Sequence, residues 1–120
     1  MKERVLEFMK DMESNDPRRV SSWFTEASTL WIPPCLPVSG LSRINALFRA
    51  LFSRYINVHW TVVDIFEVSP TRCLHICDSW GEMKGRDNYS NRVITDITFD
   101  ADGKISYLSD YFKDTAVFHK

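Results

Sequence analysis

The residue that points most directly to chemistry is Asp110, a lone acid in the apolar strand pattern near the end of the chain. Side chains alternate across a strand, so Asp110 shares a face with Leu108 and Phe112. If that face lines a cavity, Leu108 contacts the substrate and Asp110 loses part of its solvation. Desolvation raises the pKa of a carboxyl group toward the range of general acid or base catalysis. The alternative is a structural acid that is hydrogen-bonded to a Trp, Tyr or Arg side chain.

Three further titratable residues in strand-like segments are candidate catalytic partners of this acid. His59 and His75 would act as proton shuttles for Asp110 if they point inward. If they point outward, they belong to a dimer face or to solvent. Asp78 shares a strand face with two apolar residues, which is unusual for a solvated row. A second carboxylate with a separated pKa would supply both an acid and a base.

Candidate substrate-binding groups are spread over several predicted elements. Asn91 interrupts an apolar row, which predicts that it orients a substrate carbonyl or hydroxyl; the alternative is a buried amide with satisfied hydrogen bonds. The hydroxyls of Tyr55 and Tyr89 and the indole N–H of Trp31 are candidate donors to a developing oxyanion. Trp23 is predicted to line the pocket or to pack in the core.

The first half of the chain carries the signals of helices. Apolar residues at helical spacing predict a helix over residues 4–13. Asp16 is a suitable N-cap for a second, short helix. The inner face of this second helix is predicted to hold Val20, Trp23 and Phe24. A strand over residues 28–34 and a proline-rich loop follow, and then a third helix from about residue 41 to 55.

From residue 56 onward the apolar period changes to two, which is typical of strands. Strands are predicted over residues 56–68, 72–83, 89–99 and 104–112. In the first strand, one face is predicted to hold Val58, Trp60, Val62, Asp64 and Phe66. In the last strand, the face opposite Asp110 is predicted to hold Ile105, Tyr107, Ser109 and Tyr111. A hairpin turn closed by Gly103, at the position that needs positive φ, joins the last two strands.

Helices followed by mostly antiparallel strands indicate an α+β fold. Strands of ten or more residues twist and coil strongly. We therefore expect a single domain over residues 1–120, in which a curved sheet covers the helices and forms a cone with an interior pocket.

Composition and charge exclude several classes of protein. The 15 basic and 16 acidic residues form no basic patch, which argues against nucleic acid as a partner. No apolar run approaches the length that spans a membrane. An odd number of cysteines and the lack of a signal peptide favour a cytoplasmic location, with Cys73 and Cys77 as small buried hydrophobes. The three histidines are scattered, so we expect no metal site and no cofactor.

The order helix, helix, strand with Trp31-Ile32-Pro33, then Gly40 opening a helix, resembles the nuclear transport factor 2-like superfamily. Three later motifs are similar to its branch of SnoaL-like polyketide cyclases, ketosteroid isomerases and limonene-epoxide hydrolases. These motifs are Tyr89-x-Asn91, Asp102-Gly103-Lys104-Ile105 and Asp110-Tyr111-Phe112-x-Asp114. The resemblance implies an α+β cone, commonly a homodimer through the outer sheet face, with Asp110 facing the cavity and Asn91 in its wall.

The epoxide-hydrolase branch also needs an Arg-x-Asp pair on the middle strand. The corresponding stretch here is Cys77-Asp78-Ser79-Trp80-Gly81, which lacks that pair and argues against epoxide hydrolysis. Two hypotheses remain. The first is a cofactor-independent isomerase or cyclase that acts on a small apolar molecule with a carbonyl group. The second is a module of the same fold that binds a small ligand or pairs with a protein partner without catalysis. Convergent titratable groups beside an apolar cavity favour the enzyme, and a cavity filled by aromatic side chains favours the module.

Overall fold

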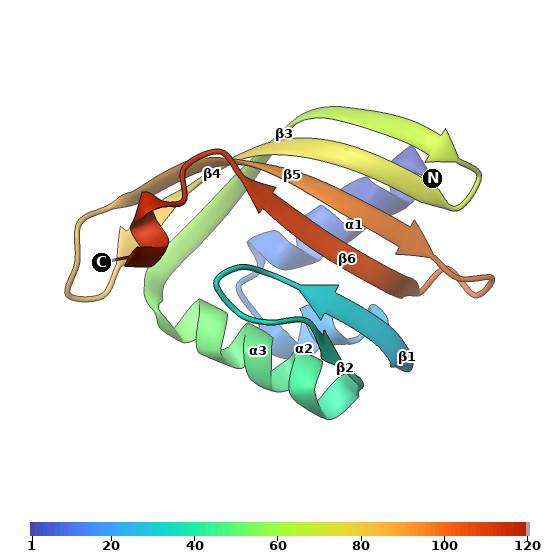
Figure 1. Cartoon of the computed structure of the whole chain (residues 1–120), viewed down its shortest axis with the longest axis horizontal. Helices are drawn as coiled ribbons and strands as arrows, with labels where there is room; N and C mark the ends of the chain where they lie inside the picture. Colours follow the sequence, from blue (N-terminus) through green and yellow to red (C-terminus); the bar gives the residue numbers. More distant parts are fainter. Residues whose placement is uncertain (120) are drawn as a thin grey trace.

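The computed structural model describes residues 1–119, in which three α-helices pack on one side of a strongly curved sheet (Figure 1). The helices are α1 (Lys2–Glu13), α2 (Pro17–Ser21) and α3 (Leu41–Ser53). The strands are β1 (Phe24–Trp31), β2 (Val38–Ser39), β3 (Tyr55–Ser69), β4 (Arg72–Met83), β5 (Tyr89–Phe99) and β6 (Ile105–Phe112), and a short 3₁₀ helix, η1 (Ala116–His119), follows. The predicted α+β class and the curved sheet over helices are confirmed.

The sheet has the strand order β2-β1-β6-β5-β4-β3. All neighbouring strands are antiparallel except β1 and β6, which are parallel. The last strand of the chain therefore lies inside the sheet, between β1 and β5. This position gives the side chains of β6 neighbours on both flanks.

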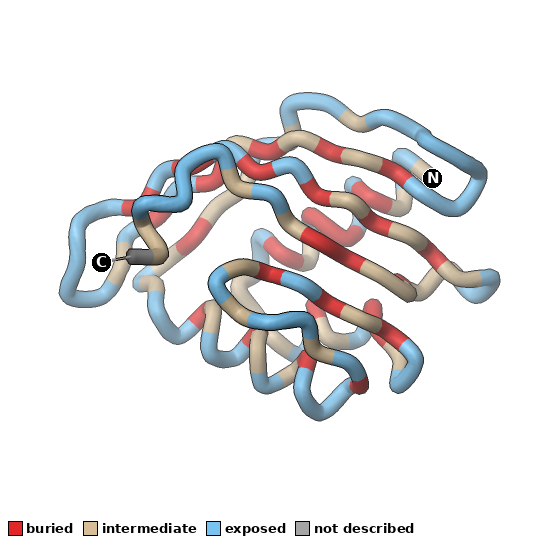
Figure 2. The backbone as a smooth tube through the Cα atoms, in the orientation of Figure 1, coloured by how far each residue is buried: buried red, intermediate tan, exposed pale blue. Residues whose placement is uncertain are grey.

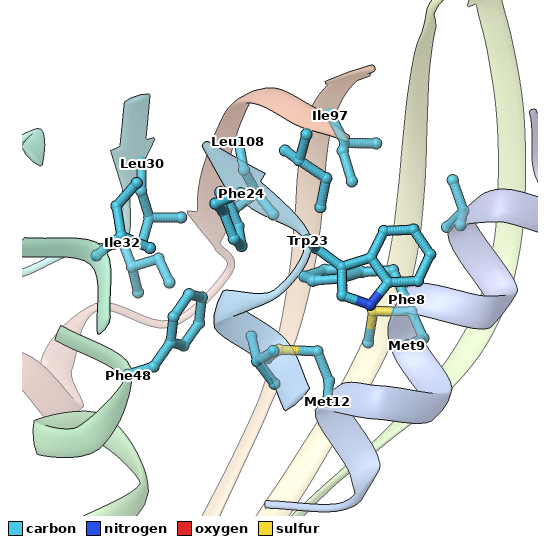
Figure 3. Close-up of a cluster of buried hydrophobic side chains, with 14 of the residues drawn as sticks. Phe8, Met9, Met12, Trp23, Phe24, Leu30, Ile32, Phe48, Ile97 and Leu108 are labelled. Atoms are coloured by element: carbon cyan, nitrogen blue, oxygen red, sulfur yellow. The ribbon is translucent and has the colours of Figure 1, made fainter. Parts of the chain in front are cut away.

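The core lies between the helices and the concave face of the sheet. Figure 3 shows side chains from the helices and β1 facing Ile97 of β5 and Leu108 of β6. Every second residue of β5 is buried, and Figure 2 shows this alternation along the central strands. The period of two in the sequence therefore reflects a sheet with one face covered by the helices and the other face exposed.

The second helix is shorter than predicted. Asp16 caps it as expected, because its carboxylate accepts a hydrogen bond from the Arg18 N–H at 3.0 Å. The helix ends at Ser21, so the prediction that Trp23 and Phe24 lie on its inner face is wrong. Strand pairing explains the difference, since the Trp23 carbonyl already accepts a hydrogen bond from the N–H of Ile105 at 2.7 Å.

An irregular register between β5 and β6 changes which residues of β6 face inward. Phe99 pairs with Ile105, but Thr98 pairs with Tyr107, so Ser106 is an extra residue on β6. Such a bulge breaks the alternation of side chains. Ile105 therefore joins the same core as Leu108, and its prediction on the opposite face is wrong.

A second register shift, between Val62 and Asp64 of β3, has the same effect at the edge of the sheet. It places Ile65 opposite His75, and both Val62 and Ile65 pack against the core. The sequence alternation put these two residues on opposite faces.

No helix within residues 1–119 is long and apolar enough to cross a membrane.

Candidate functional site

Three polar side chains form a row across the concave face of the sheet. His75 of β4 is paired with Thr95 of β5, and Thr95 is paired with Asp110 of β6. Neighbouring strands are about 4.8 Å apart, so this register brings an imidazole and a carboxyl group to either side of one hydroxyl. The sequence predicted both Asp110 and His75 as candidates, and the sheet register brings them together.

The row lies at an interior cavity of about 20 Å³, which has room for about one water molecule. The cavity is lined by Phe8, Met9, Met12, Ile32, Phe48, Trp60, His75, Cys77, Val93, Thr95, Leu108 and Asp110. Figure 3 shows several of the apolar members reaching inward from α1, α3, β6 and Ile32, which directly follows β1. The cavity thus has its polar groups on the sheet side, and its helix side is apolar.

Asp110 is held in place by Thr95, whose hydroxyl donates a hydrogen bond to Oδ1 at 2.6 Å. Burial in the apolar cavity raises the pKa of Asp110 to about 6, and the hydrogen bond from Thr95 opposes part of this rise. A carboxyl group in this state exchanges a proton close to neutral pH.

His75 is almost fully buried, with 1% of its surface exposed. Within the described part of the chain, its Nδ1 is the one buried side-chain nitrogen or oxygen without a hydrogen-bond partner. Burial lowers the pKa of His75 to about 4, so the imidazole is neutral at pH 7. Buried polar atoms are rarely left without a partner. Since Nδ1 has no protein partner, it is available to form a hydrogen bond with a bound molecule.

The thiols of the inner face are not suited to nucleophilic chemistry. Burial, together with the nearby Asp110 and Asp78 carboxylates, raises the pKa of Cys77 to about 12. Burial also raises the pKa of Cys73. Because the thiolate is the reactive form, both residues are inert. Among residues 1–119, no three His, Cys, Asp or Glu side chains gather as a metal site would require.

The other two predicted catalytic residues lie away from this cavity. Asp78 is on the convex face, where the Arg92 guanidinium donates two hydrogen bonds to it at 2.8 and 3.0 Å. This ion pair lowers the pKa of Asp78. His59 lies on the edge strand β3 and is hydrogen-bonded to Glu13 at the end of α1.

Asn91 faces inward but is used to hold the end of the chain. Its amide donates to the Asp114 carbonyl at 2.8 Å and accepts from the Asp114 N–H at 3.0 Å. Tyr55 and Tyr89 stack edge to face with their ring centres 5.7 Å apart. Burial raises the pKa of both hydroxyls, so they stay protonated. None of the three lines the cavity.

The two tryptophans predicted for the pocket have other surroundings. The indole N–H of Trp23 donates to Asp11 at 2.8 Å, and the Arg4 guanidinium lies 4.1 Å from its ring centre. Trp31 is 42% exposed at the end of β1. Neither side chain lines the cavity.

Several cavity residues, among them Thr95, Met9 and Met12, were not predicted as site residues from the sequence. Thr95 was visible as a polar residue in an apolar strand row, but a straight count from the hairpin turn pairs it with Ser109. The extra residue in β6 moves its partner to Asp110. Met9 and Met12 read as ordinary core residues of an amphipathic helix, and no sequence signal marks them as cavity walls.

Comparison with solved structures identifies the same fold in several proteins. SalBIII, an epoxide hydrolase/cyclase-like enzyme with a role in pyran ring formation in the polyether salinomycin, is 15% identical, with a TM-score of 0.82 over 95% of this chain and 91% of that one. TerC, co-crystallized with polyporic acid, is 15% identical, with a TM-score of 0.81 over 98% and 93%. A protein of ketosteroid isomerase-like fold from Catenulispora acidiphila, in complex with trimethylamine, is 16% identical, with a TM-score of 0.81 over 91% and 84%.

A comparison with curated protein sequences gives no match. The family model described as the SnoaL-like domain, in contrast, matches residues 5–108, which leave out only the first turn of α1, the part of β6 after Leu108 and the segment that follows β6. The match ends at Leu108 and so includes His75 and Thr95 of the polar row. The chain belongs to the SnoaL-like domain family.

Proposed function

We propose that the interior cavity catalyses general acid–base isomerisation or cyclisation of a small, apolar molecule that carries a carbonyl group. The observation that supports this most strongly is the row His75, Thr95 and Asp110, in which two titratable groups flank one apolar cavity. Pairs of titratable groups whose pKa values are displaced by their surroundings are typical of acid–base sites.

Asp110 acts as the base in the proposed mechanism. Its pKa of about 6 leaves the carboxylate ionised at pH 7, and Thr95 holds Oδ1, so Oδ2 is the oxygen that takes a proton from the carbon next to the carbonyl. The electron pair of that C–H bond forms an enolate. Isomerisation is completed when protonated Asp110 returns the proton to a different carbon. In a cyclisation, the enolate carbon attacks a second carbonyl and the proton goes to the new alkoxide.

His75 stabilises the enolate oxygen in this mechanism. A neutral imidazole that carries its proton on Nδ1 donates a hydrogen bond to that oxygen, and no protein group in residues 1–119 competes for this atom. Hydrogen bonds to a developing negative charge are worth more in a water-poor site than in solution. The apolar walls therefore serve both the binding of the substrate and the chemistry.

Access to the cavity requires movement, because about 20 Å³ is too small for an organic substrate. Met9 and Met12 of α1 are the walls that we propose to move. Methionine is unbranched and has three rotatable bonds, so it changes shape at a low cost in energy. A substrate displaces these two side chains from the space above Asp110.

The proteins of similar structure support a cyclase or isomerase in different ways. SalBIII is linked to pyran ring formation, and TerC was co-crystallized with polyporic acid. Both facts concern those proteins, and we extend only the substrate class to this chain. We do not extend epoxide hydrolysis, because the middle strand lacks the Arg-x-Asp pair.

The isomerisation of cyclohex-3-en-1-one to its conjugated isomer is a direct test, followed by ultraviolet absorbance. We expect the wild-type protein to accelerate this reaction, and Asp110→Asn to lose the acceleration at least a hundredfold, the effect typical of removing a catalytic base. Asp96→Asn is the matched control, because this acid lies on the convex face in an ion pair with Arg72. Equal rates for wild type and Asp110→Asn would reject the mechanism.

A non-catalytic interaction module is the second candidate, and the convex sheet face favours it. Large apolar side chains are exposed there, among them Trp80, Ile94 and Tyr111 at 43%, 41% and 59%. Exposed apolar patches of this kind mark interaction surfaces. We infer a homodimer through this face, with two chains in solution by analytical ultracentrifugation. Ile94→Lys is expected to give a monomer, and a wild-type monomer would contradict the inference.

We also propose a cytoplasmic location for a single domain over residues 1–120. The three cysteines are free thiols in the described structure, which fits a reducing compartment. Cell fractionation tests this proposal directly.

A further inference from the structure

We propose a second binding site, for an apolar molecule with a carboxylate group, in the surface groove between α3 and the loop that joins β1 to β2. The groove has a volume of about 510 Å³, within the range of small-molecule sites. It is independent of the proposed catalysis. Figure 1 shows α3 beside β2 and this loop, and residues of both segments line the groove.

The groove follows from the sequence of its two walls. On α3, Ala46 and Ala50 leave space one turn apart, and Leu47 and Leu51 form apolar walls beside them. The facing loop contains the rigid pair Pro33-Pro34, whose fixed φ angles limit its collapse onto the helix. The groove is therefore a preformed apolar space that side chains do not fill.

The charges on the groove select the ligand. Arg43 and Arg54 line it on the same side of α3, three turns and about 16 Å apart along the helix axis. Within residues 1–119, neither guanidinium makes a hydrogen bond or ion pair with a protein group, and α3 contains no acidic residue. Arginine binds carboxylates through two parallel hydrogen bonds. Apolar walls with unpaired arginines at the ends fit an amphipathic anion.

Charge also distinguishes this groove from the interior cavity. Among the described residues, Ile32 alone lines both, so the two spaces have largely separate walls. The Asp110 carboxylate inside the cavity would repel an anion at neutral pH, whereas the arginines outside attract it. An anionic apolar ligand is thus excluded from the cavity and directed to the groove.

Decanoate is a suitable probe, and decan-1-ol is its neutral counterpart of similar length. We expect decanoate to bind more tightly than decan-1-ol, with amide NMR shifts confined to α3 and the loop. Cys35 provides a second readout, because it lines the groove and is partly exposed, whereas Cys73 and Cys77 are buried. Bound decanoate should slow the reaction of this thiol with Ellman's reagent.

Three variants make the assignment specific. The double variant Arg43→Gln/Arg54→Gln should weaken decanoate binding about tenfold and leave decan-1-ol binding unchanged, as expected for loss of charged hydrogen bonds. Ala50→Trp should fill the channel and prevent binding of both molecules. Arg49→Gln is the matched control, because Arg49 is an exposed arginine of α3 that does not line the groove.

Several results would overturn the proposal. Equal affinity for decanoate and decan-1-ol would remove the role of the arginines. NMR shifts centred on the Asp110 row would place the ligand in the cavity instead. Self-association that Ala50→Trp abolishes would show that a second copy of the chain occupies the groove.

Discussion

The displaced pKa values of Asp110 and His75 make opposite contributions to the pH dependence of folding. The pKa of Asp110 rises from 3.8 to about 6 on folding, a difference of about 2. Each pKa unit corresponds to about 1.4 kcal/mol, so ionised Asp110 lowers the free energy of unfolding by about 3 kcal/mol. The protonated form is favoured in the folded state, so this loss of stability develops as the pH rises from about 4 to about 6.

His75 acts in the other direction over nearly the same range. Its pKa falls from 6.5 to about 4 on folding, so the unfolded chain binds a proton that the folded chain does not. Stability therefore falls as the pH decreases from about 6.5 to about 4, again by about 3 kcal/mol. In the wild-type protein the two contributions nearly cancel, and single substitutions should reveal each one.

Urea denaturation at several pH values measures both contributions. For Asp110→Asn, the difference in unfolding free energy from wild type should be constant below about pH 4 and should shift in favour of the variant by about 3 kcal/mol by pH 7. His75→Leu should lose the rising contribution and become less stable, relative to wild type, as the pH increases from about 4 to about 6.5. Subtracting the wild-type free energy of unfolding at each pH cancels the contributions of all other titrating groups. A difference between Asp110→Asn and wild type that is independent of pH would refute a raised pKa for this acid.

Further predictions follow from other contacts. Gly81→Ala should destabilise the protein by about 3 kcal/mol or more in urea denaturation, because a Cβ at this position would lie 2.3 Å from the Asn57 carbonyl oxygen; unchanged stability would contradict the close approach. Asn91→Ala should release the segment that it holds through Asp114 and cost about 1–3 kcal/mol, with faster tryptic cleavage after residue 113 as the measurement. The kcat/KM for cyclohex-3-en-1-one should rise through about pH 6 as Asp110 ionises and then stay level to about pH 8, and a fall above pH 6 would indicate that Asp110 works in its protonated form.

Much of the architecture could be predicted from the sequence because its periods are clear. The limits of β4 and β5 agree with the prediction, since turn residues bound both alternating segments. The inward direction of Asp110 follows from its apolar neighbours at spacing two. The direction of Asp78 was open, because two apolar residues share its face; of these, Trp80 proves to be exposed on the convex side and Ile76 half-buried.

The remaining details depend on interactions between distant segments. The extra residue Ser106 cannot be placed from the period alone, so Thr95 could not be identified as the partner of Asp110. The end of the second helix is set by pairing of Trp23 with Ile105, which lies far along the chain. The small size of the cavity depends on how the side chains of α1 pack against the sheet, and helix periodicity gives only the side that is buried.

The most direct test of the account is an NMR titration of the Asp110 side-chain carboxyl carbon in the wild-type protein, with its resonance assigned by its absence in Asp110→Asn. We predict a midpoint near pH 6, because burial among apolar side chains raises the pKa of this group. A midpoint near 4, the ordinary value for aspartate, would show that water reaches the carboxylate freely and would contradict the proposed site.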